Sequence, residues 1–214
     1  GLQERMSPVL LVVAGPNGSG KTTVTVRLRA EHWSEGVEYI NPDEIARDRF
    51  GDWNAPHAVL DAARWATARR AQLLATRSGI AFETVFSAPD KLDFLARARD
   101  AGFFVRLFFI GTCDPRINAA RVANRVMAGG HTVPIEKIVS RFERSVANLP
   151  VAIDIAHRTY IFDNSADGIE ARLRARIQDG LLRKIYGELP EWVATVVAPL
   201  PRHPDFIDVR FPGS

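Results

Sequence analysis

A glycine-rich loop that follows an apolar run constrains this chain more than any other feature of its sequence. The run covers residues 9–14, and the loop has the pattern G-x-x-x-x-G-K-[ST]. Glycines let consecutive backbone N–H groups turn toward one centre, which makes a cradle for phosphate oxygens. The pattern therefore predicts a nucleoside triphosphate site formed by Gly15, Pro16, Asn17, Gly18, Ser19, Gly20, Lys21 and Thr22.

Three residues at the end of the loop have separate predicted roles. Lys21 is placed to reach the β- and γ-phosphates, and the hydroxyl of Thr22 can ligate Mg²⁺. Thr23 completes the predicted nucleotide-binding set at the start of a helix expected over residues 22–31. The positive end of this helix would face the phosphates, so a nucleotide and Mg²⁺ are the expected ligands.

Apolar runs bounded by turn residues alternate with helix-like stretches, which is typical of a parallel α/β sheet. Strands are expected at residues 9–14, 37–41, 81–86, 105–110 and 159–162. Further helices are expected over residues 56–77, 91–101, 114–128 and 135–147, the last of them ending before Pro150.

The length and composition fit one domain. With 214 residues, of which 46% are hydrophobic, the chain can bury a substantial core. We expect the domain over residues 6–198, a proline-rich surface tail over 199–214, and a processed or appended end over 1–5. The chain has one cysteine and no apolar stretch of eighteen residues, which favours a soluble cytoplasmic protein with no membrane partner.

Polar residues follow each predicted strand, at the edge where open parallel sheets bind ligands. Asp43 follows the second strand and is the leading general-base candidate, because a carboxylate there can accept the proton of an attacking hydroxyl. The alternative is that Asp43 only caps a helix, since Asp followed by Glu-Ile-Ala is also a typical helix start.

Two further strand ends supply candidate residues. Glu83 and Thr84 lie near the end of the third strand, and Asn164 follows the fifth on the nucleotide side. A carboxylate inside an uncharged run needs a partner if it is buried. Glu83 is therefore better explained by binding a substrate hydroxyl, or by helping to arrange Mg²⁺, than by a solvated face.

An arginine-rich segment covers residues 114–146. It holds six Arg or Lys and three Asp or Glu, a net charge of +3 that equals the formal charge of the whole chain. Arg121 and Arg125 are four residues apart and so share a helix face, and Arg141 follows on the next predicted helix. Their guanidinium groups can grip phosphates from a helical lid; the alternative is a solvated basic face.

His131 lies beside two glycines and has two interpretations. It contacts substrate, or it makes a structural hydrogen bond to the backbone, and the structural role is slightly favoured. The histidines and the single cysteine show no metal-ligand spacing, so the only metal expected is the Mg²⁺ of the nucleotide. Net charge alone does not argue for nucleic acid, and no such partner is expected.

Five motifs together resemble the zeta-toxin-like P-loop kinases over residues 9–165. They are the loop ending at Lys21, Asn41-Pro42-Asp43-Glu44, Phe82-Glu83-Thr84, Arg121-x₃-Arg125 followed by Gly129-Gly130-His131, and Asp163-Asn164-Ser165. The resemblance implies a P-loop kinase-like three-layer α/β sandwich, in which helices and a helical lid flank a mainly five-stranded parallel sheet. The lid is expected over residues 114–146.

The resemblance also implies a reaction and a partner. An ATP-dependent kinase of this kind transfers the γ-phosphate to the 3′-hydroxyl of the aminosugar in UDP-N-acetylglucosamine, and a small antitoxin protein blocks the nucleotide site. By matching position, Lys21 and Thr22 hold ATP and Mg²⁺, and Asp43 is the base. Glu83 and Thr84 meet the substrate, while the paired arginines bind phosphate.

Two other functions stay open. One keeps the kinase but replaces the acceptor with another metabolite, a nucleoside or an antibiotic that carries a hydroxyl group. The other is a nucleotide-dependent regulator that uses its arginine-rich segment on nucleic acid. Interleaved aromatic residues would favour the regulator, and Phe142 is the one aromatic residue between positions 114 and 146.

Overall fold

The structure is a computed structural model that describes residues 7–31, 34–51, 55–130 and 133–209. Strands and helices alternate through most of it, and a mixed group of strands ends it. In chain order the elements are β1 (Val9–Ala14), α2 (Lys21–Ala30), β2 (Val37–Ile40), α3 (Pro42–Phe50), α4 (Pro56–Ala75), β3 (Gly79–Thr84), α5 (Asp90–Asp100), β4 (Phe104–Gly111), α6 (Pro115–Met127), α7 (Ile135–Ile155), β5 (Arg158–Asp163), β6 (Arg172–Gln178), β7 (Leu181–Ile185), α8 (Glu191–Val197) and β8 (Arg202–Asp208).

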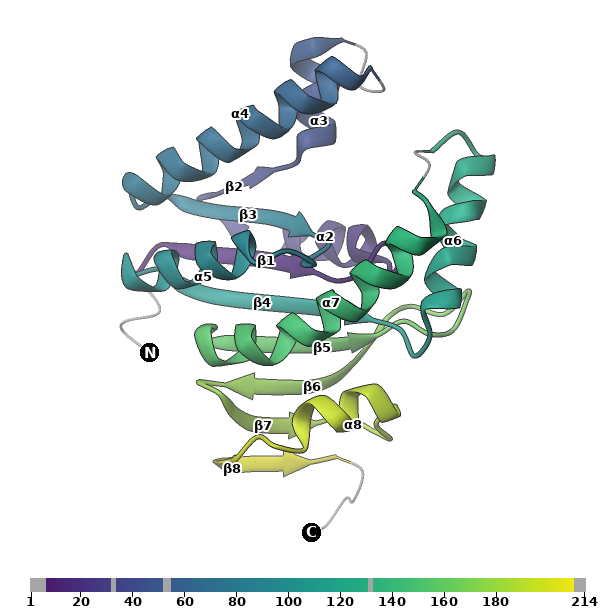
Figure 1. The fold of residues 1–214 in the computed structure, drawn as a ribbon. Coiled ribbons are helices and arrows are strands. Elements are labelled where there is room, and N and C mark those ends of the chain that lie inside the picture. Colours follow the sequence, from purple (N-terminus) through teal and green to yellow (C-terminus); the bar gives the residue numbers. More distant parts are fainter. Residues whose placement is uncertain (1–6, 32–33, 52–54, 131–132, 210–214) are drawn as a thin grey trace.

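The described strands form one eight-stranded sheet in the order β2-β3-β1-β4-β5-β6-β7-β8 (Figure 1). Strands β1 to β5 pair in parallel, β6 is antiparallel to both β5 and β7, and β8 is parallel to β7. The apolar strand β1 lies between β3 and β4, and its residues 10–14 are buried. The phosphate loop therefore begins in the middle of the edge where parallel sheets bind ligands.

Helices cover the two faces of this sheet unequally. The main core lies under α4, α5, α7 and α8, where residues such as Phe82, Phe94 and Ile153 pack together. A smaller cluster on the opposite face joins Val13 and Phe108 to helix α2, the one described helix that contributes to it. The sheet is thus thickly covered on one face, whereas the other face is covered by a helix only near β1 and β3.

The predicted α/β class with a parallel sheet flanked by helices is confirmed, and the sheet is larger than the expected five strands. The additional strands are β6, β7 and β8. In β6, arginines at positions 172, 174 and 176 alternate with apolar residues. That period of two is a strand pattern, but its high charge hides it from a search for apolar runs.

Helix α7 continues past Pro150, where the sequence predicted it to end. The structure extends the helix to Ile155, with Pro150 inside it and exposed. A proline removes one helical hydrogen bond. The buried residues Leu149, Ala152 and Ile153 lie on the core side of the same turns, and burial of this apolar face favours a continuous helix.

The C-terminal segment also differs from the expectation of a surface tail. Residues 202–208 form β8, which pairs with β7, and Phe206 packs against the main core. Pro204 lies within this strand, and prolines are tolerated in edge strands because one side has no ladder partner. Across the described parts of the chain, no helix has the length and apolarity needed to cross a membrane.

His157 connects α7 to β5 as a neutral hydrogen-bond acceptor. The backbone N–H of Val105 donates to its Nδ1 at 3.0 Å, and its ring stacks on Phe104 with centroids 4.8 Å apart. Burial lowers the pKa of His157 from its usual value near 6.5, and the neighbouring Arg99 lowers it further. A doubly protonated imidazole could not accept this hydrogen bond.

The lowered pKa of His157 predicts an acid-sensitive fold. The unfolded chain binds a proton on this ring below about pH 6.5, whereas the folded chain does so only at lower pH. The contribution of His157 to the free energy of unfolding should therefore be complete above about pH 6.5. It should decrease as the pH drops toward the pKa of the folded state. Denaturant titrations at several pH values between 5 and 7.5 measure this slope, and His157→Gln, which still accepts but does not titrate, should flatten it. An equal slope in both proteins would exclude His157 as the cause.

Candidate active site

The loop between β1 and α2 fits closely against the ends of the neighbouring strands. The backbone N–H of Gly15 donates to the carbonyl of Thr84 at 3.1 Å. A Cβ atom at Gly15 would collide with the carbonyl oxygen of Ile110, and one at Gly20 would collide with the amide of Asn164. Gly20 also has a φ of +91°, which disfavours any side chain. Glycine is therefore required at both ends of the loop.

Lys21 begins helix α2 and bends back over the loop. Its amine donates to the carbonyl oxygens of Gly15 at 2.7 Å and Pro16 at 3.0 Å. Burial lowers the pKa of Lys21 to about 8, the Glu83 carboxylate opposes this shift, and Arg125 adds to it. The lysine is thus placed over the loop in advance, with a charge that depends on what else occupies the site.

The start of α2 is open to an anion. Gly20 precedes the helix, and no side chain in the described chain caps its first turn. The N–H groups of a first helical turn have no partner within the helix and attract negative charge. Thr22 and Thr23 are exposed in this turn, and Thr22 lines the adjoining cavity.

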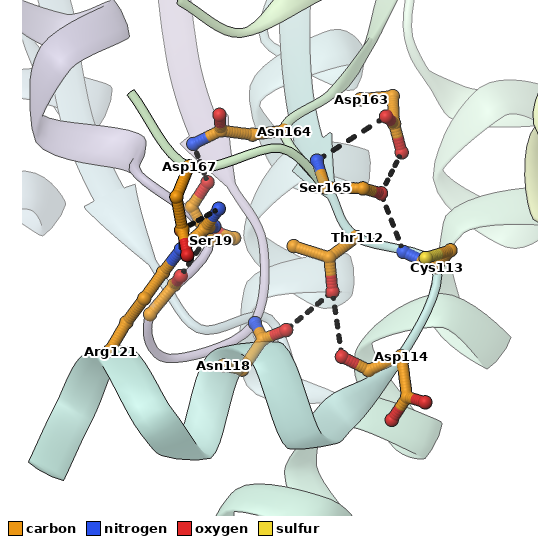
Figure 2. A network of polar contacts seen from close by, with 11 residues as sticks. Ser19, Thr112, Cys113, Asp114, Asn118, Arg121, Asp163, Asn164, Ser165 and Asp167 are labelled. Carbon is orange, nitrogen blue, oxygen red and sulfur yellow. Dashed lines mark hydrogen bonds and ion pairs between the residues drawn. The ribbon is translucent and has the colours of Figure 1, made fainter. Parts of the chain in front are cut away.

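Helix α6 braces the loop from one side (Figure 2). The buried Asn118 donates from Nδ2 to the carbonyl of Asn17 at 2.8 Å, and its Oδ1 accepts a hydrogen bond from Thr112. Arg121 donates to the carbonyl of Gly18 at 3.2 Å. Side chains of α6 therefore hold two consecutive carbonyls of the loop in place.

The end of β5 braces the loop from the other side. Asn164 donates from Nδ2 to the carbonyl of Ser19 at 2.9 Å. Next to it, the Ser165 hydroxyl donates to Asp163 at 2.7 Å and accepts the N–H of Cys113 at 2.9 Å, which ties β5 to the end of β4 (Figure 2). Asn164 was predicted to bind nucleotide directly; here it contacts the loop backbone, and a direct contact stays a prediction.

A cavity of about 640 Å³ opens beside the loop. It brings together two cations, Lys21 and Arg125, and two carboxylates, Asp43 and Glu83, from four different elements. The full lining is Asn17, Gly18, Gly20, Lys21, Thr22, Tyr39, Ile40, Asn41, Pro42, Asp43, Glu83, Thr84, Val85 and Arg125. Residues predicted from separate strand ends therefore meet in one space.

Asp43 is not the cap of helix α3. Asn41 is the cap, since its side-chain oxygen accepts the N–H of Asp43 at 2.9 Å, and Pro42 occupies the first helical position. The Asp43 side chain is therefore not needed to start the helix, and it lines the cavity that contains Lys21. This removes the cap interpretation, while the role of Asp43 as a base stays a prediction.

Glu83 has the partner that its position in an apolar strand required. The hydroxyl of the buried Thr25, in the second turn of α2, donates to Glu83 Oε1 and also to the carbonyl of Lys21. Glu83 is thereby held on the α2 side of β3, close enough to influence the charge of Lys21. Thr84 lies next to it and supports the turn by accepting the N–H of Phe86 at 3.0 Å.

Arg121 and Arg125 of α6 have different surroundings in the structure. Arg125 lines the cavity, whereas Arg121 lies between the Gly18 carbonyl and Asp167, whose carboxylate is 3.1 Å from its guanidinium. Arg141 is half-buried on α7 and is not among the described residues that line the cavity. His131 lies outside the described residues.

Several residues that shape the site have no role predicted from the sequence. Tyr39 lines the cavity with a pKa raised by burial and by the nearby Glu83 and Glu44. Thr25, Asn118 and Thr112 hold Glu83 and the loop in place. Thr25 and Asn118 lie within helices, and Thr112 directly follows β4. Their residue types do not mark them as site residues, so the only signal in the sequence is their short distance from the phosphate loop or from the end of a strand. In the described ranges, no group of three His, Cys, Asp or Glu residues could hold a metal ion.

Known proteins share this arrangement of elements. A protein of Haemophilus influenzae whose function is uncharacterised is 30% identical over 128 residues, which is 60% of this chain and 88% of that protein. The crystal structure of AvrRxo1-ORF1:-ORF2 with ATP has a TM-score of 0.63 at 19% identity, over 82% of this chain and 60% of that chain. This chain therefore spans about three-fifths of the AvrRxo1 chain that it matches.

A second solved structure comes from the PezAT chromosomal toxin-antitoxin system of Streptococcus pneumoniae. Its TM-score is 0.54 at 16% identity, over 74% of this chain and 69% of that chain. At these identities the likeness concerns the fold. The Zeta toxin family profile matches residues 2–170, a range that includes the phosphate loop, both carboxylates of the cavity and the strand ends that brace the loop. The chain therefore belongs to the Zeta toxin family.

Proposed function

We propose that this protein is an ATP-dependent kinase that phosphorylates a hydroxyl group of a small molecule. The observation that carries the proposal is the shared cavity of Lys21, Asp43 and Glu83 beside a phosphate loop. The crystal structure of AvrRxo1-ORF1:-ORF2 with ATP supports ATP as the phosphoryl donor, since its fold is similar. The size of the cavity, about 640 Å³, lies in the usual range for small-molecule sites.

The loop of this chain fits a triphosphate and its Mg²⁺. Side chains at Gly15 and Gly20 are sterically excluded, Lys21 lies over the loop, and the hydroxyl of Ser19 is buried without a hydrogen-bond partner in the described chain. Lys21 would bind the β- and γ-phosphates, and Thr22 would hold Mg²⁺. When bound, Mg²⁺ neutralises charge on the phosphates and orients the transferred group.

Asp43 is the proposed general base. The acceptor oxygen forms a bond to the γ-phosphorus while the bond from that phosphorus to the bridging oxygen breaks, and ADP leaves. The hydroxyl proton passes to the Asp43 carboxylate. Glu83 and Thr84 line the same cavity and would position the acceptor, while Arg125 would balance the charge that develops on the transferred group.

UDP-N-acetylglucosamine is the proposed acceptor, through its aminosugar hydroxyl. Family membership supports this choice, and the cavity has polar and apolar walls for a sugar nucleotide. A second hollow of about 400 Å³ shares Tyr39, Ile40 and Asn41 with the cavity, so it lies next to the proposed acceptor site. A small antitoxin is the proposed protein partner, in line with the PezAT toxin-antitoxin system of similar fold.

One experiment tests both the reaction and the acceptor. The protein is incubated with Mg-ATP and either UDP-N-acetylglucosamine or a metabolite extract, and newly phosphorylated species are identified by mass spectrometry. We expect a mass gain of one phosphoryl group on the sugar nucleotide. A phosphorylated extract metabolite with no change in UDP-N-acetylglucosamine would retain the kinase and reject this acceptor, while no phosphorylated product in either reaction would reject the kinase.

Replacing Arg125 by alanine should lower kcat on the order of a hundredfold, as removal of one charge-stabilising group typically does. The reason is that Arg125 is exposed and lines the cavity, so that its guanidinium acts on bound ligand more than on the fold. Arg125→Lys should restore only part of the rate, since it lacks the planar fork. Steady-state rates and melting temperatures are compared with those of Arg116→Ala, an 89% exposed arginine of the same helix. Equal rates for the two alanine variants would remove Arg125 from the mechanism.

The lowered pKa of Lys21 predicts that ATP binding becomes weaker as pH rises above about 8. A triphosphate stabilises the charged amine and so raises its pKa, which means that binding takes up a proton in this window. Calorimetric titrations at pH 8.5 in two buffers of different ionisation enthalpy measure the uptake. Lys21→Ala should show weaker binding and no uptake from this group; uptake of the same size in that variant would assign the proton to another residue.

A further inference from the structure

The face of the sheet opposite the main core carries a layer of cations and aromatic rings on β4 to β7. Strand alternation sends these side chains to one side, because their neighbours in each strand point into the main core. We call this surface the basic–aromatic face, and it consists of Phe104, Arg106, Phe108, Arg158, Tyr160, Arg176, Lys184 and Tyr186.

Positive charge is more concentrated in strands β4 to β7 than in the arginine-rich segment at 114–146. Strands β4 to β7 contain seven Arg or Lys residues and one acidic residue, Asp163. Their net charge of +6 is twice that of the arginine-rich segment at 114–146 and twice that of the whole chain. The excess lies in the sheet and not in the predicted lid.

The arginines of β4 and β5 contact the aromatic side chains of Phe104 and Tyr160. The guanidinium groups of Arg106 and Arg158 are 4.9 and 5.2 Å from the ring centroid of Phe104. Arg106 also donates to the phenol oxygen of Tyr160 at 2.7 Å, and the Tyr160 ring stacks on Phe108 with centroids 4.7 Å apart. These contacts hold the charged groups in place against the sheet.

The same pattern continues on β6 and β7. Arg176 lies 5.9 Å from the ring centroid of Tyr160, and Lys184 lies 4.8 Å from that of Tyr186. Arg176 also donates to the Tyr186 phenol at 3.5 Å. Cations and rings thus alternate across four neighbouring strands, which is the interleaving that the segment at 114–146 lacks.

Like charges are opposed on this face. Arg106 is the register partner of Arg158, and Arg176 is the register partner of Lys184. Cations opposite one another on neighbouring strands destabilise a sheet. Asp179, in the turn after β6, lies 3.5 Å from Arg158 and offsets part of the charge. A polyanion bound on this face would place further negative charge against these cations.

Among the described helices, only α2 contributes to the core on this side of the sheet, and it meets the basic–aromatic face at the buried Phe108. Helix α2 packs over β1 and β3 on this side, while α5, α7 and α8 lie on the other side, over the main core (Figure 1). The face is strongly cationic. Its cations are half-buried and held against rings, and two rings of the face, Phe104 and Phe108, are buried.

We propose that the basic–aromatic face binds a single strand of nucleic acid. Residues two apart in a strand lie roughly 7 Å apart and neighbouring strands about 4.8 Å apart, a grid on which a flexible phosphodiester chain can contact several cations in turn. Guanidinium planes held against rings also offer surfaces on which unpaired bases stack. An acidic protein segment would use the charge but not the stacking.

Fluorescence anisotropy with a labelled 20-nucleotide oligo-dT tests the proposal, with saturating Mg-ATP present so that the nucleotide site is filled. If four cations contact phosphate, log K should fall against log salt with a slope of about −2.8, at about −0.7 per contact for single strands. The double variant Arg176→Gln/Lys184→Gln should bind at least about tenfold more weakly at low salt, with the slope reduced by about 1.4. Arg176→Lys keeps the charge and should lose only the part that depends on stacking.

A matched control separates this face from general positive charge. Arg64→Gln/Arg144→Gln removes two exposed arginines from α4 and α7, which cover the opposite face, and should bind oligo-dT like the wild type. Melting temperatures confirm that each variant is folded. The proposal is overturned if the wild type does not bind, if both double variants bind alike, or if polyglutamate of equal charge competes as well as unlabelled oligo-dT, an outcome that would indicate an acidic protein partner.

Discussion

Replacing Lys21 by alanine is expected to reduce phosphoryl transfer to a proven acceptor by on the order of a thousandfold, the upper range for loss of one charge-stabilising donor. The Lys21 amine is the cation nearest the loop, where it donates to the carbonyls of Gly15 and Pro16. Arg121 reaches a loop carbonyl from α6 but is paired with Asp167, and Arg125 lines the cavity from the same helix. Among the described residues, neither lies over the loop as Lys21 does. Product formation with Mg-ATP is measured by mass spectrometry over a time course.

Folding should be affected much less than activity in this variant. The Lys21 side chain itself lines the cavity, so in the variant water can take the place of the amine on the two carbonyls. Mg-ATP should raise the melting temperature of the wild-type protein by mass action, and this shift should be much smaller for Lys21→Ala. Lys137→Ala, an exposed lysine of α7, is the matched control and should behave as wild type. Wild-type turnover in Lys21→Ala would contradict the phosphate-loop assignment.

The part of the fold that follows from the sequence is the part with strong local signals. Strand β1 was predicted with its observed bounds, because its apolar run is buried on both faces and ends at an unmistakable loop. Strands β2 to β5 and helices α2, α4, α5 and α6 also follow from local patterns, with ends that differ by a few residues. The apolar periodicity and the turn residues that mark these elements lie within the segments themselves, so the sequence alone reveals them. Helix α3 entered only as an alternative explanation of Asp43, and α7 ends at Ile155 instead of at residue 147.

The remaining elements depend on tertiary contacts, which a local sequence pattern does not reveal. In β6 an arginine at every second position masks the strand pattern, and in β7 the adjacent Arg183 and Lys184 interrupt the apolar residues. Helix α7 continues through Pro150 because its apolar face is buried against the core. Strand β8 forms because β7 offers it a free edge. In each case tertiary packing outweighs the preference of the segment itself.

The candidate site shows the same division. The positions of the strand ends predicted that Asp43 and Glu83 would lie near the loop with Lys21, because carboxyl ends of parallel strands share an edge. Arg125 was expected there as part of a helical lid, and it lines the same cavity. It could not predict that Arg121 would turn to the Gly18 carbonyl and Asp167, although its helix face is the one expected. Which of several nearby polar groups an arginine contacts depends on differences of a few ångströms, and these cannot be read from the sequence.

Replacing Asp43 by asparagine is the second large expected effect, a loss of about 10²–10⁴ in turnover, as is typical for removal of a general base. Affinity for ATP should change little, since Asp43 is assigned to the acceptor side of the cavity. The substitution keeps the size of the side chain and the backbone N–H that Asn41 accepts, so helix α3 keeps its start. Initial rates at saturating ATP and acceptor give kcat, and a separate titration gives the affinity for ATP.

Glu44→Gln tests whether the effect is only one of charge near a helix start. Glu44 follows Asp43 in the first turn of α3, and its carboxylate lies 3.4 Å from Arg29 at the surface. Loss of either negative charge from this turn should cost roughly 0.3–1 kcal/mol of stability, so a purely structural role predicts the same small effect for both variants. A base role instead predicts that turnover collapses in Asp43→Asn alone. Near-wild-type turnover in both variants would remove Asp43 from the mechanism and leave Glu83 as the remaining carboxylate of the cavity able to accept the proton.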